Sequence, residues 1–322
     1  MKRLLIKVFA GLLAVALLQI PLGYVLATRE NPLREQLDAL VPMHPDVLYL
    51  GDSVLESVAS SDAPPISLAS MLKKGLPGMS LGFLSGPGHG PEVHRDETAY
   101  VLGKGLRPRA IVVPINLRSF SEFWDQMPQL QYSRERFWLR HGDLLGRGLH
   151  GPMSTYQLYS ALEGYARSEK EYDRIPVVRG TGTLGTLGEI FKGPAPELHL
   201  ADSFNATYLY SLASDHRKVL ALSGLARICR DSGIPLLAYV TPIDIETCER
   251  LLGPGIRPRI EKNIDVVRVA MEREGAQWKD AAFLLKARDF DWHRYPNEHL
   301  NENGRRRLAE VLDSWLLSSC GR

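Results

Sequence analysis

Ser53 has the residue type and the local setting of a catalytic nucleophile. It closes the tripeptide Gly51-Asp52-Ser53, which follows the apolar run 47–50 and precedes a segment, 54–58, that can continue as a helix. A serine at such a strand-to-helix turn has its hydroxyl beyond the carboxyl edge of a sheet, where open α/β folds bind their ligands. The unpaired N–H groups of the following helix lie beside it. This setting predicts a nucleophile at Ser53.

His299 is the matching candidate for a base. It begins the segment His-Leu-Asn-Glu-Asn-Gly, and the apolar residues at 308, 311, 312, 315 and 316 then repeat at helical spacing. His299 is therefore expected in the loop just before an amphipathic helix, where a lone histidine would most simply cap that helix. Paired with Ser53 across the top of a sheet, it is better interpreted as a general base. A serine hydroxyl is a poor nucleophile until a neighbouring base takes its proton.

These blocks resemble the SGNH, or GDSL-type, hydrolase superfamily. The resemblance rests on Gly51-Asp52-Ser53, on an Asn after a central apolar run, and on the His-Leu-Asn-x-x-Gly segment at His299. In that family the serine is the nucleophile, the late histidine is the general base, and a Gly and an Asn complete the oxyanion hole. The resemblance implies these oxyanion roles for Asn116, which follows the run 110–115, and for Gly88, chosen among the glycines of Ser-Gly-Pro-Gly-His-Gly.

The carboxylate that would orient the histidine departs from the family pattern. The family usually has Asp three residues before the histidine, and that position is Pro296 here. Asp291 is the first candidate, because the loop residues that follow it could carry it back toward His299. Glu298 and Asp289 are the alternatives. The acid is also the member of a serine triad whose loss can cost least, so its displacement does not argue against catalysis.

A rival arrangement uses a second histidine. Asp291-Trp292-His293 is an Asp-x-His pair, as in the relatives that acetylate alginate. His293 is therefore an alternative base.

The N-terminal segment predicts where the rest of the chain lies. Residues 1–7 are basic, and the run 8–27 has no charge and is about as long as the roughly 20 residues that a spanning helix needs. Positive charge before such a run predicts that this end stays in the cytoplasm and that the following domain lies outside it. We therefore interpret 1–27 as a membrane anchor, with a cleaved signal sequence as the alternative.

The whole chain has 44% hydrophobic and 24% charged residues, which is ordinary for a globular domain over 28–322 plus the N-terminal segment. A formal net charge of +2 gives no reason to expect a nucleic acid partner. The three cysteines, Cys229, Cys248 and Cys320, have no metal-type spacing, and buried thiols are expected rather than a disulfide. Neither a metal nor a cofactor is implied.

Strand-like and helix-like stretches alternate along the chain, which predicts an α/β fold whose parallel sheet is covered on both faces. Strands are predicted at 47–50, 79–84, 110–115, 235–241 and 277–278, and helices include 92–103, 216–231 and 260–274. With the resemblance, this implies a three-layer, flavodoxin-like SGNH fold with a parallel sheet of about five strands.

One stretch, about 119–214, is too long for an ordinary crossover and is rich in aromatic residues. It is expected to be a helical insertion. It could pack on the sheet edge, or it could form a lid over the substrate site, since it departs directly after Asn116; the two interpretations are compatible.

Two classes of function fit these features. The first is a membrane-anchored, extracytoplasmic serine esterase or O-acyltransferase. Resemblance to the SGNH proteins of envelope polysaccharide acylation and teichoic acid D-alanylation implies an acylated cell-envelope glycan or a small ester as substrate. The second is a non-catalytic relative that binds an envelope glycan or a partner protein of an envelope assembly, as Pro296 would permit. A lipase or thioesterase would share the chemistry. The sequence fits hydrolysis and acyl transfer equally, because the outcome depends on whether water or a sugar hydroxyl reaches the acyl-enzyme.

Overall fold

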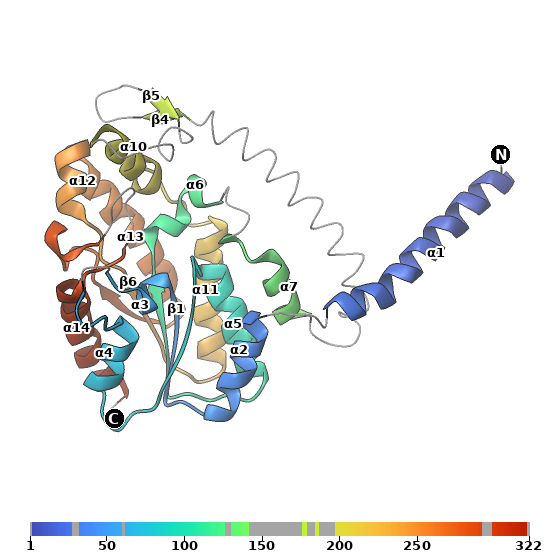
Figure 1. Ribbon diagram of the computed structural model, residues 1–322, viewed down its shortest axis with the longest axis horizontal. Helices are drawn as coiled ribbons and strands as arrows, with labels where there is room; N and C mark the ends of the chain where they lie inside the picture. The colour runs from blue at the N-terminus through green and yellow to red at the C-terminus, as the bar shows by residue number, and fades with distance from the viewer. Residues whose placement is uncertain are drawn as a thin grey trace.

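A five-stranded parallel sheet forms the centre of the molecule (Figure 1). The computed structural model describes residues 2–27, 32–59, 62–125, 130–141, 176–178, 184–186, 197–291 and 298–320. The strands, in spatial order, are β2 (Leu81–Gly86), β1 (Val47–Asp52), β3 (Ala110–Ile115), β6 (Leu236–Val240) and β7 (Gln277–Asp280). Numbered along the sheet, this is the flavodoxin-like order 2-1-3-4-5. The predicted α/β fold with a parallel sheet of about five strands is therefore confirmed, and all five strands lie at or near their predicted positions.

Helices cover both faces of the sheet and make three layers. One face packs against α2 (Pro32–Leu40), α5 (Pro91–Gly103), α11 (Arg217–Asp231) and α13 (Ile256–Glu272). The other face packs against α4 (Leu68–Gly75) and α14 (Glu302–Cys320). Side chains of a strand alternate between faces, and Leu48 and Leu50 accordingly lie in the first core while Val47 and Tyr49 lie in the second. Apolar residues on both sides explain why the central strands read as unbroken apolar runs.

The helix that follows β1 is shorter than predicted. We expected it to continue through 54–58, but α3 (Ser53–Glu56) ends at Glu56. Ser57 has extended backbone angles, φ −66° and ψ 138°, and both its N–H and its hydroxyl donate to the carbonyl of Ser53. A serine hydroxyl that bonds back to the preceding turn competes with helix continuation, which accounts for this early end.

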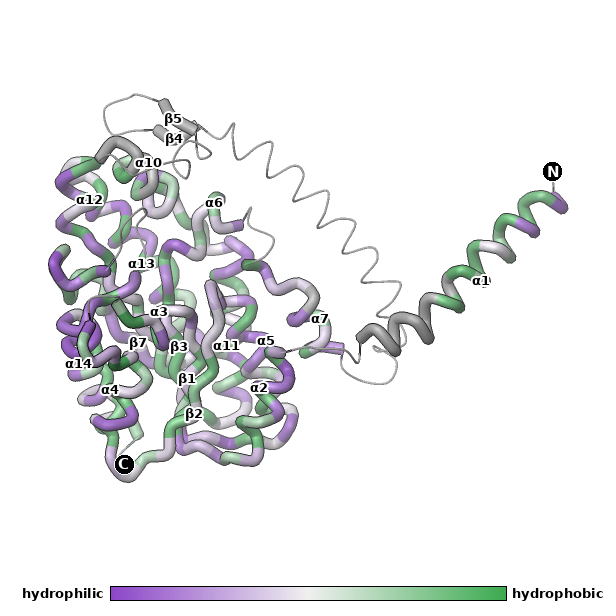
Figure 2. The backbone as a smooth tube through the Cα atoms, in the orientation of Figure 1, coloured by the Kyte–Doolittle hydropathy of each residue, from purple (hydrophilic) through white to green (hydrophobic). Residues whose placement is uncertain are grey.

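The N-terminal segment forms one long helix, α1 (Lys2–Ala27). Its described apolar side chains are exposed, Phe9 and Leu18 among them, and Figure 2 shows this hydrophobic stretch away from the sheet. Across the residues that the structure describes, no helix has both the length and the apolar character needed to cross a membrane. The anchor or signal sequence over 1–27 therefore stays a prediction.

The predicted insertion is described in parts, and those parts are largely helical. They comprise η2 (Leu117–Phe120), α6 (Glu122–Asp125), α7 (Ser133–Arg140), β4 (Pro176–Val178), β5 (Leu184–Thr186) and α10 (Glu197–Tyr208). The short antiparallel pair of β4 and β5 was not predicted. The remaining elements are η1 (Val41–Met43), α12 (Ile245–Leu252) and η4 (Ala287–Asp289). All three cysteines are buried free thiols, as expected.

Candidate active site

Each residue of the Gly-Asp-Ser tripeptide has a distinct structural part at the carboxyl end of β1. A Cβ atom on Gly51 would lie 2.9 Å from a ring carbon of Tyr49, so a side chain does not fit there. Asp52 is buried and caps α3, because its carboxylate accepts a hydrogen bond from the backbone N–H of Val54 at 2.9 Å. Ser53 is the first residue of α3 and is half-buried. The turn therefore presents the Ser53 hydroxyl at the edge of the sheet.

The structure brings together the two residues from which the chemistry was inferred. Ser53 Oγ lies 3.0 Å from His299 Nε2, which is hydrogen-bond distance. Burial lowers the pKa of His299, the positive charge of Arg118 lowers it further, and the carboxylates of Asp52 and Asp291 oppose these effects. A histidine with a lowered pKa is neutral at pH 7 and can accept a proton. Ser53 and His299 have the geometry of a nucleophile and its base.

Of the three candidate orienting carboxylates, Asp291 has the closest relationship to His299. The backbone N–H of Asp291 donates to the carbonyl of His299 at 2.9 Å, and its charge favours the protonated histidine. Asp289 instead accepts from the backbone N–H of Lys286 at 3.1 Å and caps η4. The rival base, His293, lies outside the described residues, so its role stays a prediction, as does the orienting role of Asp291.

Asn116 joins the two catalytic blocks. Its side-chain nitrogen donates to Asp52 at 3.1 Å and to Glu298 at 2.8 Å, and its side-chain oxygen accepts from the backbone N–H of Arg118 at 3.1 Å. An amide nitrogen has two hydrogens, and both have carboxylate partners here. Asn116 lies directly after β3 and contacts the neighbour of Ser53, and an oxyanion role would require one of these hydrogens to leave its carboxylate.

Glu298 belongs to a buried polar network rather than to the face of His299. Tyr208 donates to it at 2.6 Å, and Arg118 forms an ion pair with it at 3.1 Å. Burial raises the pKa of Glu298, and the charge of Arg118 lowers it. The guanidinium of Arg118 also lies 4.6 Å from the ring centre of Trp124, within cation–π range.

The contacts of Glu298 with Tyr208 and Arg118 were not predicted from the sequence. Arg118 is two residues after Asn116, and this proximity could have indicated that its side chain lies near the candidate site. Tyr208 comes from α10, at the far end of the insertion, and no sequence pattern connects it with Glu298.

Gly88 occupies a position that only glycine suits. Its φ of 70° lies in the left-handed region, and an added Cβ would lie 2.8 Å from Leu130 and 2.9 Å from Trp124. Both of these residues belong to the insertion, so the first part of the insertion packs directly over the loop that contains Gly88. Gly88 lies in the loop directly after β2, and its oxyanion role stays a prediction.

Neighbouring contacts hold this loop from both sides. The hydroxyl of Tyr132 donates to the carbonyl of Pro87 at 2.6 Å, and its ring meets the ring of His89 edge-on, with centres 4.6 Å apart. His89 in turn forms an ion pair at 3.0 Å with the buried carboxylate of Glu97 on α5. The loop is therefore fixed between α5 and the start of α7.

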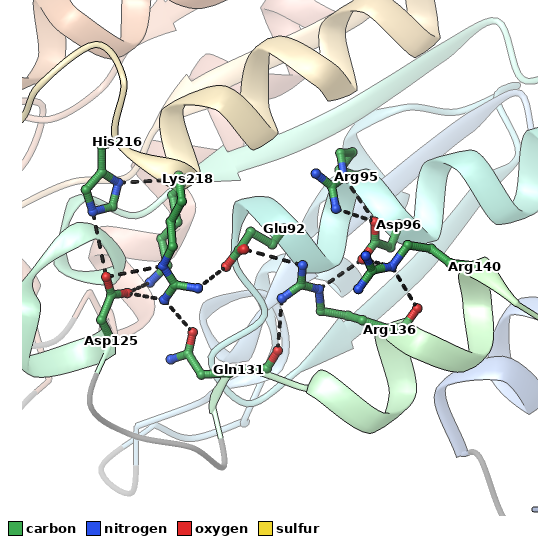
Figure 3. A network of polar contacts seen from close by, with 10 residues as sticks. Glu92, Arg95, Asp96, Asp125, Gln131, Arg136, Arg140, His216 and Lys218 are labelled. Atoms are coloured by element: carbon green, nitrogen blue, oxygen red, sulfur yellow. Dashed lines mark hydrogen bonds and ion pairs between the residues drawn. The ribbon is translucent and has the colours of Figure 1, made fainter. Parts of the chain in front are cut away.

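A second network attaches the first part of the insertion to the helices beneath it (Figure 3). Asp125 of α6 pairs with Lys218 of α11 at 2.5 Å. Arg136 of α7 pairs with two carboxylates of α5, Asp96 at 2.9 Å and Glu92 at 3.3 Å. The described helices α6 and α7 are thus fixed to α11 and α5, while the edge-packing and lid interpretations of the insertion stay predictions.

Within the described ranges, no group of three or more His, Cys, Asp or Glu side chains is arranged to hold a metal ion. The candidate site comprises the hydroxyl of Ser53, the imidazole of His299, the amide of Asn116 and the carboxylates that these groups contact or face.

No family model and no curated protein matches this chain. Among solved structures, an acetylxylan esterase from Geobacillus stearothermophilus is 13% identical with a TM-score of 0.43, covering 86% of this chain and 94% of its own. An alpha/beta hydrolase enzyme from the metagenome of Lake Arreo, Spain, is 13% identical with a TM-score of 0.42, over 86% and 95%. The inhibitor-bound aryl esterase of M. smegmatis is 10% identical with a TM-score of 0.36, over 84% and 98%. Likenesses this distant say nothing about the activity of this chain.

Proposed function

We propose that this chain is an exported SGNH-type serine esterase or O-acyltransferase that acts on an acyl group of a cell-envelope glycan or a related ester. The observation that carries the proposal is the 3.0 Å contact between Ser53 Oγ and His299 Nε2. The local setting supports it, because Ser53 opens a helix at the carboxyl edge of a parallel sheet and His299 has a lowered pKa.

The reaction would proceed through an ester of Ser53. His299 Nε2 takes the hydroxyl proton as Ser53 Oγ attacks the substrate carbonyl, and the resulting tetrahedral intermediate carries a negative oxygen. The intermediate collapses when the bond to the leaving alcohol breaks and Nε2 returns the proton to that oxygen. Water or a sugar hydroxyl then loses a proton to Nε2 and attacks the acyl carbon. The bond from that carbon to Ser53 Oγ breaks, and Nε2 returns the proton to Oγ, which restores the serine. Water gives hydrolysis, and a sugar hydroxyl gives transfer.

Three further residues would support this chemistry. We assign the oxyanion to Gly88 and Asn116, with Asn116 redirecting the hydrogen that it donates to Asp52, the longer of its two carboxylate contacts. Donors of this kind contribute about 3 kcal/mol each to the transition state. Asp291 would orient His299 and stabilise its protonated form, since its charge already acts in that direction.

The proposed location rests on the N-terminal segment. The basic residues 1–7 and the uncharged run 8–27 favour an extracytoplasmic domain attached through α1. If so, the full-length protein fractionates with membranes, and external protease digests its carboxyl-terminal domain in spheroplasts. Protection of that domain in intact spheroplasts would contradict this topology, and a mature chain that begins at Thr28 would identify a cleaved signal sequence instead.

A non-catalytic glycan-binding or partner-binding protein is the second candidate. It is favoured by one observation, namely that both side-chain hydrogens of Asn116 already have carboxylate acceptors. In a protein without turnover, both hydrogens would stay bonded to Asp52 and Glu298, because no oxyanion would need them.

Labelling with a serine-directed fluorophosphonate, together with turnover of an activated acetyl ester, tests the proposal. We expect the wild type to be labelled and active, and Ser53→Ala to be folded but neither labelled nor active. Ser314→Ala is the matched control, because Ser314 is an exposed serine on α14 and lies outside the site. A wild type that is neither labelled nor active would support the non-catalytic alternative, and label or activity retained in Ser53→Ala would exclude Ser53 as the nucleophile.

A further inference from the structure

A second hydroxyl lies beside the same nitrogen of His299. Ser57 Oγ is 3.5 Å from His299 Nε2, while Ser53 Oγ is 3.0 Å from it. Ser57 is four residues after Ser53, at the C-terminal end of α3, so both serines project from the same side of this short helix. Both are half-buried. One imidazole nitrogen is therefore shared by two serine oxygens.

The hydrogen of Ser57 already has a partner. The hydroxyl donates to the backbone carbonyl of Ser53 at 2.5 Å. A hydroxyl has one hydrogen and two lone pairs, so Ser57 Oγ can face His299 Nε2 only as an acceptor. While Nε2 is unprotonated, two lone pairs face each other and no hydrogen bond forms. Once Nε2 carries a proton, Ser57 Oγ can accept it in a hydrogen bond.

We propose that Ser57 is a positioning residue that accepts the Nε2–H hydrogen bond of His299 after that nitrogen has taken the proton of Ser53. The inference rests on the proposed function above. In the acylation step the proton moves from Ser53 Oγ to Nε2, and Ser53 Oγ becomes bonded to the acyl carbon. Ser57 Oγ then holds the Nε2–H until the proton passes to the leaving oxygen, and no bond to Ser57 is made or broken.

This arrangement favours the transition state over the resting enzyme. Ser57 interacts with His299 only when the imidazole is protonated, and an interaction made only at that stage accelerates the reaction. A hydrogen bond to a charged group is stronger than one between neutral groups. Its loss is expected to reduce kcat/KM by about tenfold to a hundredfold.

Other charged groups around His299 act on the same equilibrium. Arg118 of η2 disfavours the protonated imidazole, whereas Asp52 at the end of β1 and Asp291 after η4 favour it. All three remain in place when Ser57 is changed. Removing Ser57 should therefore lower the pKa of His299, because the protonated form loses an acceptor while the neutral form loses nothing.

The substitution to test is Ser57→Ala, with Ser57→Thr as the matched control. Threonine keeps the hydroxyl, and the extended backbone at this residue, φ −66° and ψ 138°, suits a β-branched side chain. We expect Ser57→Ala to lower the plateau of kcat/KM by about tenfold or more and to move its acid limb to lower pH. Ser57→Thr should restore both. A lower plateau with an unmoved acid limb would mean a purely structural role and would overturn the proposal.

A measurement without turnover separates this proposal from the proposed function. In the full chain carrying Ser53→Ala, the imidazole of His299 is titrated by NMR with labelled histidine, and its signal is identified by its absence in His299→Ala. Adding Ser57→Ala should lower the pKa of His299 by about one unit, equivalent to a tenfold change. An unchanged or higher pKa would refute the role of Ser57 whether or not the wild type is an esterase, while a wild type inert to fluorophosphonate would refute only the proposed function.

Discussion

Asn116 donates a side-chain hydrogen bond to Glu298 at 2.8 Å, so the end of the central strand β3 is joined to the residue just before His299. The same amide also reaches Asp52, the residue before Ser53. The position of His299 relative to Ser53 is thus fixed through buried polar contacts as well as through the loop that carries His299. Changes in this network should affect folding and activity together, whereas changes to groups that act only on protons should affect activity alone.

Four single variants assayed with one activated ester assign the base and its orienting acid. His299→Ala should abolish acylation of Ser53, because Nε2 of His299 lies 3.0 Å from the hydroxyl, while His293→Ala should cost little. Asp291→Asn should lower kcat by about 10²-fold to 10⁴-fold, as when a serine triad loses the group that sets its tautomer. Glu298→Gln should cost less in kcat. An essential His293 with a dispensable His299 would show that the Asp-x-His arrangement operates.

The lowered pKa of His299 predicts a specific pH dependence of the rate. The unfolded value is about 6.5, and the folded value lies below it because burial and Arg118 disfavour the charged imidazole. The acid limb of kcat/KM should therefore fall below pH 6.5, since His299 must be neutral to accept a proton. Arg118→Met removes the charge and should move the limb to higher pH. A limb at or above pH 6.5 in the wild type would contradict the prediction.

The same pKa shift predicts how stability depends on pH. Between pH 6.5 and the lower folded pKa, the unfolded chain binds a proton at His299 that the folded chain does not. The contribution of His299 to the free energy of unfolding is therefore greatest above pH 6.5 and is lost as pH falls through the folded pKa. Urea unfolding of the wild type and His299→Gln across pH 5–8 isolates this contribution. The difference in stability between them should shrink toward acid pH, and a constant difference would count against the shift.

The buried ion pair between Arg118 and Glu298 should matter more for stability than any exposed pair. Arg118→Ala leaves Glu298 buried without its cation, which is expected to cost about 3–5 kcal/mol in the free energy of unfolding. Arg268→Ala is the control, because Arg268 pairs with Glu272 on the surface of α13 and its loss should change the free energy of unfolding little. Comparable losses in urea titrations of the two variants would show that the buried pair is unimportant.

Gly88→Ala tests whether the insertion positions the Gly88 loop. The new methyl group would meet Leu130 and Trp124 within 3 Å, so the loop must shift and the rate should fall by about 10²-fold, the effect of losing one oxyanion donor. Gly105→Ala is the matched control, since Gly105 also has a positive φ but an added Cβ would have no atom within 4 Å. Both variants share the backbone strain, and only Gly88→Ala should lose activity. Equal activity in the two would separate the loop from catalysis.

The strands of the sheet and the positions of Ser53 and His299 could be predicted from local sequence patterns. Strands buried on both faces appear as unbroken apolar runs, and the terminal helix appears as a helical repeat of apolar residues, so both can be recognised locally. The strand-to-helix turn at Ser53 and the loop before α14 follow directly from those two patterns. The end of α3 at Glu56 was not predicted. A hydrogen bond from the Ser57 hydroxyl to the carbonyl of Ser53 accompanies this end, and no periodicity in the sequence indicates that bond.

The contacts between side chains that are far apart in the sequence follow from the tertiary structure alone. The contact between Glu298 and Tyr208 joins residues 90 positions apart, and the packing of Trp124 and Leu130 on Gly88 joins the insertion to the loop after β2. Such contacts depend on how loops cross the sheet edge, and no periodicity in the sequence encodes that path. The same reason explains why the sequence, which favoured Asp291, could not show the parts of the other two carboxylates. Only the fold turns Glu298 into the core and uses Asp289 to cap η4, while Asp291 donates its backbone N–H to the carbonyl of His299.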